Sequence, residues 1–320
     1  MKTLLRILFV VSAALSSISA SAQGYPNRPI TIIVPFGPGS GTDTITRIVA
    51  QHLGTALNQS IVIENKVGAN GAIAAVYVAR SAPDGYTLFM GTNSPHSAAP
   101  SINKTVPYDP VKDFAGITRV GSFTIMLAVD ARMSAKSIPE LVAYATATPG
   151  KLSYGTGNTA GIVAGAAFKK WAGLDIVHVP YKTVPEALTD VLGGRIQMIF
   201  VDLSPGLPHF NSGTLRPLGS TRLQRSALLP NIPTLDELGI SNLEVDAWAG
   251  LFAPANTPAD IVNRLNAEVR KIIADPQVKA QIAKVGFDAF TSTPAELDEF
   301  VKVQLVKWTK MIKDAGIAAQ

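Results

Sequence analysis

The sequence predicts an α/β fold with mainly parallel sheets and helices on both faces. Short β-branched runs such as "ITIIV" (30–34), "SIVIEN" (60–65) and "IQMIFVD" (196–202) alternate with segments of helical periodicity. The chain has 320 residues, of which 47% are hydrophobic and only 16% are charged, so it can bury one or two large cores. These observations exclude a disordered chain, and the length favours two domains.

The first strand-helix-strand unit runs from "ITIIV" through a helix over about 44–57, in which Ile45, Ile48 and Val49 share one side, to "SIVIEN". Further strands are predicted at "GYTLFMG" (85–91), "TIMLAV" (124–129), "KLSYGTG" (151–157), "DIVHVPY" (175–181) and "LRPLGST" (215–221). Four hydroxyls precede a carboxylate by three residues and predict helix starts: Ser137 with Glu140, Thr183 with Glu186, Thr257 with Asp260, and Thr293 with Glu296.

The C-terminal third reads as three helices, over about 258–274, 276–285 and 294–315, with only "FDAFTS" (287–292) as a strand between the last two. This ending fits a chain that leaves its first domain, builds a second and returns. The crossings are expected within "ITRVGSFTIMLAV" (117–129) and between "TLDELG" (234–239) and "VDAWAGLF" (245–252). Domain 1 is therefore predicted to contain residues 23–123 and 242–320, and domain 2 residues 124–241.

The N-terminus resembles a secretory signal peptide over residues 1–22, because Lys2 and Arg6 precede a short apolar run and the small residues Ala20-Ser21-Ala22. A membrane anchor is the alternative, but the apolar run is shorter than a span and contains serines. No cysteine follows to take a lipid, so the mature chain is expected free in the periplasm. Loss of Lys2 and Arg6 would lower the net charge from +5 to +3, and the scattered basic residues argue against nucleic-acid binding.

The stretch "VPFGPGSGTD", Val34 to Asp43, combines three glycines with a following helix. No lysine follows the glycines, which excludes a Walker phosphate loop, and Thr42 occupies the third position of a dinucleotide fingerprint. Free N–H groups at a helix N-terminus still make an anion site, suited to carboxylate or phosphate. The alternative is an ordinary strand-to-helix turn with Thr42 or Asp43 as the N-cap.

Enzyme motifs are missing from the sequence. It has no cysteine, no G-x-S-x-G and no H-E-x-x-H, and its four histidines are isolated from one another. His178, within the apolar "IVHVP", is interpreted as a core histidine. No metal site and no cofactor are predicted.

Six segments together resemble one family: "YPNRPITIIVPFGPGSGTD", "VIENKVGANGAIAAVYVARSAPDGYTLFMGT", "YDPVKDFAGITRVG", "DIVHVPYKTVPEALTDVLGGRIQMIFVD", "LPHFNSGTLRPLGSTR" and "VDAWAGLFAPANTPADIVNRLN". They are similar to the extracytoplasmic solute receptors, or Bug receptors, of the tripartite tricarboxylate transporter family. The resemblance covers nearly the whole mature chain. It implies a two-domain periplasmic-binding-protein (venus flytrap, type II-like) fold whose first domain contains both chain ends.

The resemblance also implies a binding site and partners. A small carboxylate would be held in the interdomain cleft and delivered to membrane permease subunits, by a monomeric receptor without catalytic function. The implied ligand-binding residues are Phe36, Gly39, Ser40, Gly41, Thr42, Asp43, Asn93, Ser94, His96, Thr156, Asn158, Thr159, Ala160, Tyr181, Lys182, Asp202 and Ser204. Asp43 would repel an anion, so a capping or water-orienting role suits it better. The glycines of "GANGAIAA" are interpreted mainly as packing.

Several of these assignments have alternatives. Asn93, Ser94 and His96 can serve ordinary turn chemistry, and Lys182 can be a solvated lysine at a helix entry. Ile162 stands where the family commonly has histidine, which favours an aromatic or aliphatic carboxylate over citrate or an acidic amino acid. The competing functions are a secreted α/β hydrolytic enzyme acting on a carboxylated small molecule, and an envelope protein without a small-molecule cleft.

Overall fold

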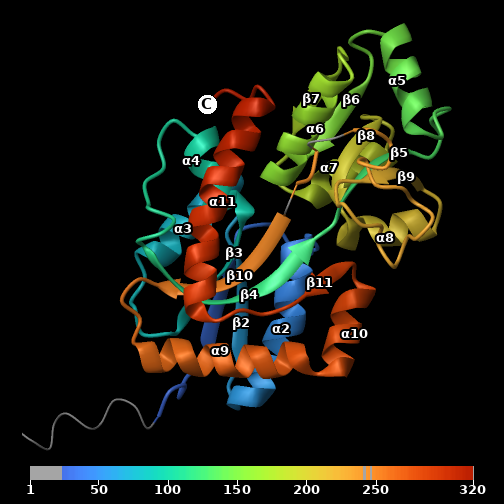
Figure 1. The fold of residues 1–320 in the computed structure, drawn as a ribbon. Helices are drawn as coiled ribbons and strands as arrows, with labels where there is room; N and C mark the ends of the chain where they lie inside the picture. The colour runs from blue at the N-terminus through green and yellow to red at the C-terminus, as the bar shows by residue number, and fades with distance from the viewer. Residues whose placement is uncertain (1–23, 241–242, 246, 320) are drawn as a thin grey trace, which may run out of the picture.

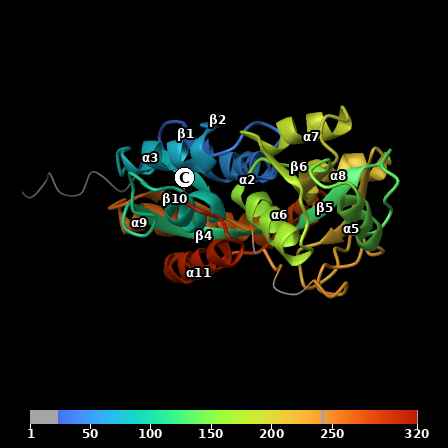
Figure 2. The same cartoon turned by 90° about the horizontal axis from the view of Figure 1, so that it is seen from above.

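Two β-sheets, each covered by helices, form two lobes (Figure 1). The computed structural model describes residues 24–240, 243–245 and 247–319, so the predicted signal peptide lies outside the described residues. The view from above separates the first lobe, with both ends of the described chain, from the second lobe (Figure 2). The predicted α/β fold with two sheets is thus confirmed.

The first lobe contains a six-stranded sheet in the order β11-β4-β10-β3-β1-β2. Its strands are β1 (Ile30–Val34), β2 (Ile61–Asn65), β3 (Thr87–Thr92), β4 (Phe114–Phe123), β10 (Ala247–Pro254) and β11 (Phe287–Ala289). Its helices are α2 (Gly41–Leu57), η1 (Ala69–Gly71), α3 (Ala72–Ala79), η2 (Ser94–Ala98), α4 (Ala99–Ile102), α9 (Ala259–Ala274), α10 (Pro276–Lys284) and α11 (Pro294–Asp314).

The second lobe contains a five-stranded sheet in the order β7-β6-β8-β5-β9. Its strands are β5 (Ile125–Asp130), β6 (Ser153–Thr156), β7 (Val177–Pro180), β8 (Met198–Asp202) and β9 (Leu215–Ser220). Its helices are α5 (Ile138–Ala147), α6 (Thr159–Trp171), α7 (Val184–Leu192) and α8 (Leu203–Asn211).

Strand direction follows from the two crossings of the chain. β1 pairs in parallel with β2 and β3, and β6 pairs in parallel with β7 and β8. β10 runs antiparallel to β3 and β4, and β5 runs antiparallel to β8 and β9, because each of these two strands enters its sheet from the other lobe. β11 is also antiparallel to β4. The sheets are therefore mixed, and the carboxyl ends of the parallel strands meet between the lobes.

Alternation along β1 explains why helices cover both faces of the first sheet. Ile32 and Val34 belong to the apolar cluster with α2 and α9, whereas Ile33 joins the cluster with α3 and α11. Since successive side chains in a strand point to opposite faces, a strand buried on both sides must be apolar throughout, as "ITIIV" nearly is.

Three of the four predicted helix caps are present. Ser137, Thr183 and Thr293 each accept a hydrogen bond from the backbone N–H of the glutamate three residues later. The prediction for Thr257 is wrong: its hydroxyl donates to the Pro254 carbonyl, and Pro258 occupies the N-cap of α9. The turn before α9 offers a carbonyl that competes for the hydroxyl proton.

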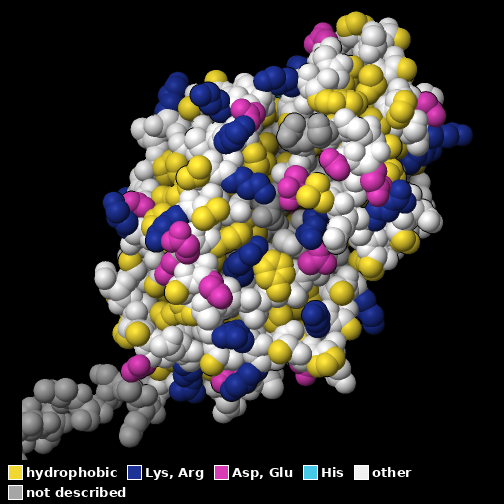
Figure 3. Space-filling view, in the orientation of Figure 1, with side chains coloured by type: hydrophobic (Ala, Val, Ile, Leu, Met, Phe, Trp, Pro, Cys, Tyr) yellow, Lys and Arg dark blue, Asp and Glu magenta, His cyan; other side chains and the backbone are white. Residues whose placement is uncertain are grey.

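Charges are mixed over the molecular surface. Lysine and arginine side chains alternate with acidic ones on the face shown in Figure 3, without a large region of one sign. No helix within the described ranges is long and apolar enough to cross a membrane. Among the residues that the structure describes, no group of three or more His, Cys, Asp or Glu side chains is arranged so that it could hold a metal ion.

Candidate functional site

A cavity of about 410 Å³, called here the interlobe cavity, lies between the two lobes at the carboxyl ends of β6 and β7. Its first-lobe wall consists of Gly68, Ala69, Asn70, Ile102 and Ile317, and its second-lobe wall of Tyr154, Thr156, Ile162, Ala166, His178, Pro180, Tyr181 and Lys182. Ligands of open α/β sheets bind at carboxyl ends of strands, so this position is typical of a binding site.

Two larger hollows are less suited to a small ligand. One of about 700 Å³ is lined by α2, β2 and their connection alone, so only one lobe contributes to it. The other, about 580 Å³, separates α2 and α10 from α7 and α8 and is lined largely by proline and leucine side chains. Of these three hollows, the interlobe cavity alone is lined by residues of both lobes at the carboxyl ends of strands.

The second-lobe wall combines aromatic and polar groups. His178 stacks on Tyr154, with ring centroids 4.9 Å apart, and its Nε2 lies 2.7 Å from the Thr156 hydroxyl. Burial, together with the nearby Lys169 ammonium, lowers the pKa of His178. The imidazole is therefore neutral at neutral pH and supplies hydrogen bonds rather than a positive charge.

The Tyr154 hydroxyl is a free donor at this wall. Tyr154 is 3% exposed, and no described residue makes a hydrogen bond with its hydroxyl. Burial raises the pKa of Tyr154 to about 12, so the hydroxyl keeps its proton. The hydroxyl oxygen keeps access to solvent, so the hydroxyl can donate a hydrogen bond to a bound acceptor.

Lys182 supplies the fixed positive charge of the cavity. It is exposed, and no described acidic side chain forms an ion pair with its ammonium. The neighbouring Tyr181 donates its hydroxyl to Asp190 at 2.7 Å, and Asp190 is also paired with Arg195. Tyr181 therefore contributes its ring to the cavity, and Lys182 contributes the charge.

The first-lobe wall is a turn in a rarely used backbone conformation. Gly68, Ala69, Asn70 and Gly71 all have positive φ, with values of 46° for Ala69 and 52° for Asn70. Non-glycine residues adopt this region at an energetic cost, and such residues gather at functional sites. The side-chain amide of Asn70 has no hydrogen-bond partner among the described residues, so it can serve a ligand.

The opening loop forms the N-terminus of α2 but does not line the interlobe cavity. Ser40 is the N-cap, and its hydroxyl accepts a hydrogen bond from the Asp43 N–H at 3.2 Å. The carboxylate of Asp43 accepts bonds from the Gly39 N–H, from Arg47 and from Asn65. The alternative prediction of Thr42 or Asp43 as the N-cap is thus wrong, because Ser40 holds that position. The Gly39 N–H already donates to the Asp43 carboxylate, so it is not free to bind a ligand.

This loop meets the second lobe directly. A Cβ atom on Gly37 would lie 2.8 Å from Cγ2 of Thr183, so a larger residue would push the lobes apart. A Cβ atom on Gly41 would lie 3.1 Å from the Phe123 ring and 3.5 Å from Cβ of Asp202. The buried side chains of Phe36 and Thr42 complete this first-lobe surface. Glycine is required here for close approach between lobes.

A second direct contact joins the lobes at Ser94. Its hydroxyl lies 2.6 Å from the Thr159 hydroxyl, and the Asn93 amide donates to the same oxygen at 3.3 Å. The Thr159 N–H donates to Ser94 Oγ, and the adjacent Ala160 is 1% exposed. The structure brings these residues together, and they contact one another rather than the interlobe cavity.

His96 lies in the core of the first lobe and not in the interlobe cavity. It is fully buried and stacks on Phe252 with ring centroids 4.1 Å apart. Burial, against a weaker effect of the Thr92 backbone, lowers its pKa to about 3. No hydrogen bond joins His96 to Ser94, so no serine-histidine pair supports the hydrolase alternative. η2 turns the His96 side chain inward, a direction that strand-end position alone does not predict.

Asn158 and Asp202 form a third polar contact near the lobe boundary. The side-chain oxygen Oδ1 of Asn158 accepts a hydrogen bond from the Gly161 N–H and caps α6, and its side-chain amide donates to Asp202 at 3.1 Å. Burial raises the pKa of Asp202 to about 7, although the Asn158 bond opposes this shift. Ser204 and Gly39 do not line the interlobe cavity. They line the hollow of about 580 Å³ that lies between α2 and α10 on one side and α7 and α8 on the other.

Of the seventeen predicted site residues, Thr156, Tyr181 and Lys182 line the interlobe cavity. The cavity is also lined by Gly68 to Asn70, Tyr154 and His178, which the sequence predicts as packing, strand and core residues respectively. The one usable signal was "GANG", since an Asn-Gly pair often adopts positive φ. The stacked pair of Tyr154 and His178 depends on the pairing of β6 with β7, which lies beyond local sequence.

Comparison with known proteins agrees with this geometry. Residues 45–317 match the model of the tripartite tricarboxylate transporter family receptor. A solved R. palustris protein with adipate is 32% identical, with a TM-score of 0.90, over 92% of this chain and 100% of that one. The periplasmic binding protein BugD is 30% identical, with a TM-score of 0.88, over 92% and 100%.

A third solved structure, MatC from Rhodopseudomonas palustris with bound malate, is 27% identical, with a TM-score of 0.85, over 90% of this chain and 100% of that one. The family match covers most of the chain, and these likenesses extend across both lobes. The chain belongs to the tripartite tricarboxylate transporter receptor family, whose members are periplasmic solute receptors.

Proposed function

We propose that this protein captures a small carboxylate in the interlobe cavity and delivers it to the membrane permease subunits of a tripartite tricarboxylate-type transporter. The observation that carries the proposal is that both lobes line a cavity containing Lys182 as its charged group. Solved relatives hold adipate and malate, which are carboxylates. The protein would act in the periplasm after removal of residues 1–22.

Ligand binding would close the two lobes, which we propose as domains of residues 23–123 with 242–320 and residues 124–241. The contacts of Gly37 with Thr183 and of Ser94 with Thr159 support a closed arrangement, because each joins one lobe to the other. A ligand that contacts both walls would stabilise these contacts. One chain supplies both walls, so a monomer suffices.

Among the predicted binding residues, we assign direct ligand contact to Thr156, Tyr181 and Lys182. The loop of Phe36, Gly39, Ser40, Gly41, Thr42 and Asp43, and the residues Asn93, Ser94, Asn158, Thr159, Ala160, Asp202 and Ser204, would instead form or border the surfaces that close. Gly41 and Thr42 keep backbone N–H groups that no described residue accepts, so an ordered water could reach them.

The test is calorimetric titration of the mature protein with a panel of carboxylates, comparing wild type with Lys182→Met and Lys182→Arg. Loss of a charge-assisted hydrogen bond is expected to weaken binding about ten- to a hundredfold in Lys182→Met. Lys182→Arg should retain most of the affinity, because the positive charge remains. Binding that is equal in all three proteins would contradict the assignment of Lys182.

The same samples distinguish a receptor from an enzyme. A receptor releases the carboxylate chemically unchanged after denaturation of the complex, whereas a hydrolytic enzyme would have converted it. Mass spectrometry of the released ligand after prolonged incubation is the readout. Recovery of a product in place of the added carboxylate would overturn the assignment as a receptor without catalytic function.

A further inference from the structure

Asn65, the last residue of β2, makes two hydrogen bonds from its side-chain amide. It donates to the Phe36 carbonyl at 2.8 Å and to Oδ1 of Asp43 at 2.9 Å, so both N–H groups of the amide are used. Asn65 is half-buried and does not line the interlobe cavity. Its two bonds join the end of β2 to both sides of the opening loop, residues 35–40, which connects β1 to α2.

Asp43 completes the hold on this loop. Its buried carboxylate also accepts the Gly39 N–H at 3.0 Å and the Nε and Nη2 groups of Arg47, each at 2.9 Å. Burial opposes ionisation, but the hydrogen bonds that the carboxylate accepts hold the pKa of Asp43 below its ordinary value. The bond from Asn65 is therefore charge-assisted at neutral pH. The opening loop is fixed at Phe36 by Asn65 and at Gly39 by Asp43.

The fixed loop meets the second lobe at the start of α7. A Cβ atom on Gly37 would lie 2.8 Å from Cγ2 and 3.5 Å from Cβ of Thr183, which is the N-cap of α7. A Cβ atom on Gly39 would lie 3.9 Å from Cγ of Pro185. Since packing at this range leaves no free space, a displaced loop would either clash with α7 or leave a gap. The shape of the loop therefore decides whether the lobes can meet here.

We infer that Asn65 is a positioning residue of this receptor, and that it holds the opening loop in the shape that fits the start of α7 when the lobes close. The inference rests on the lobe closure in the proposed function. A loop held in place beforehand loses little conformational freedom on closing, whereas a free loop must be ordered at that step. Asn65→Leu keeps the side-chain size but removes both donors, and Asn65→Asp turns acceptors towards the Asp43 carboxylate. Both changes should release the loop.

A disulfide trap measures how often the loop meets α7. The chain has no cysteine, and the 3.5 Å between the Cβ positions of residues 37 and 183 suits a disulfide, in which the Cβ atoms lie about 3.5–4.5 Å apart. The mature Gly37→Cys/Thr183→Cys protein should therefore form this bond with oxidised glutathione as the oxidant. Titration of the remaining thiols over time gives the rate of trapping.

Asn65→Leu in this double-cysteine protein should slow trapping about tenfold or more, because the loop loses two hydrogen bonds, one of them to a charged group. Asn65→Asp should slow it at least as much. Glu64→Gln is the matched control. It changes the preceding residue of β2, whose side chain points to the other face of the strand, so the trapping rate should stay unchanged.

The comparison uses proteins with native circular dichroism, and Asn65→Asp serves alone should Asn65→Leu fail to fold. Equal trapping rates with and without the change at Asn65 would overturn the inference, and so would absence of the disulfide in every protein. A lower urea midpoint with an unchanged trapping rate would show a role in stability alone and would also overturn it. No ligand is added, so the result does not depend on whether a carboxylate binds in the calorimetric panel that tests the proposed function.

Discussion

His96 shows how much a side-chain direction matters. Sequence position placed it beyond a strand end, where ligands bind, yet it is buried against Phe252, Phe114 and Trp248. Both ring nitrogens of His96 are buried without a hydrogen-bond partner, so a proton taken up there would place an unpaired charge among aromatic rings. The consequence is a pH-dependent stability rather than a role in binding.

The folded protein therefore binds a proton at His96 only near pH 3, whereas the unfolded chain binds one near the ordinary value of 6.5. Its contribution to stability is present above about pH 6.5 and is lost as pH falls from there towards 3. Relative to His96→Leu, wild type should lose about 2 kcal/mol of unfolding free energy between pH 7 and pH 5. Urea titrations at the two pH values measure this difference. Parallel losses in both proteins would show that His96 can be protonated in the fold.

At the scale of elements, turns are harder to predict than helices and strands. The C-terminal helices were located within a residue or two, because their apolar periodicity and proline starts are local signals. From the sequence, the glycines of "GANG" are interpreted mainly as packing, and the residues that pack against the turn after β6 are not encoded locally. Gly157 is an example, since it packs against the backbone of Thr183, which lies in the same lobe but 26 residues later in the chain.

The turn between β6 and α6 should tolerate no side chain at Gly157. A Cβ atom there would lie 2.2 Å from the backbone carbon of Thr183 and 2.2 Å from the backbone nitrogen of Val184. Gly157→Ala should therefore destabilise the protein by about 1–3 kcal/mol, or more if the backbone cannot shift. Gly193→Ala is the control, because its nearest neighbour would be the Thr189 carbonyl at 3.2 Å. Similar unfolding midpoints for the two variants would contradict this close packing.

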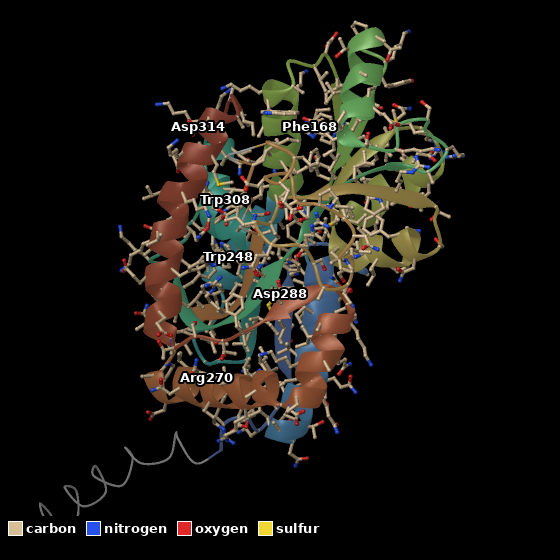
Figure 4. The ribbon with its side chains drawn as sticks, turned by 45° about the vertical axis from the view of Figure 1, so that its right-hand side comes forward. Phe168, Trp248, Arg270, Asp288, Trp308 and Asp314 are labelled. Atoms are coloured by element: carbon tan, nitrogen blue, oxygen red, sulfur yellow. The ribbon has the colours of Figure 1, made fainter. Side chains whose placement is uncertain are left out.

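At the scale of the whole molecule, the lobes are joined by contacts far apart in sequence. Lys170 of α6 donates to the Asp314 carbonyl at the end of α11, the end that Figure 4 shows beside α6. Arg222, in the segment returning from β9 to β10, binds Ser122 and pairs with Asp288 at 3.1 Å. The sequence predicts the two crossings from strand-like runs, and the domain bounds that follow from them stay a prediction. The cavity could not, because it forms only where both lobes come together.

The central claim is that a small carboxylate binds in the interlobe cavity, and two neighbouring alanines of α6 test it most directly. Ala166 lines this cavity, whereas Ala167 lines a separate groove beside α11. The measurement is calorimetric titration, into Ala166→Phe and Ala167→Phe with native circular dichroism, of a carboxylate from the panel that binds the wild-type protein. The account predicts that Ala166→Phe fills the cavity and abolishes binding, while Ala167→Phe binds like wild type. Wild-type affinity in Ala166→Phe, or loss of binding only in Ala167→Phe, would contradict it.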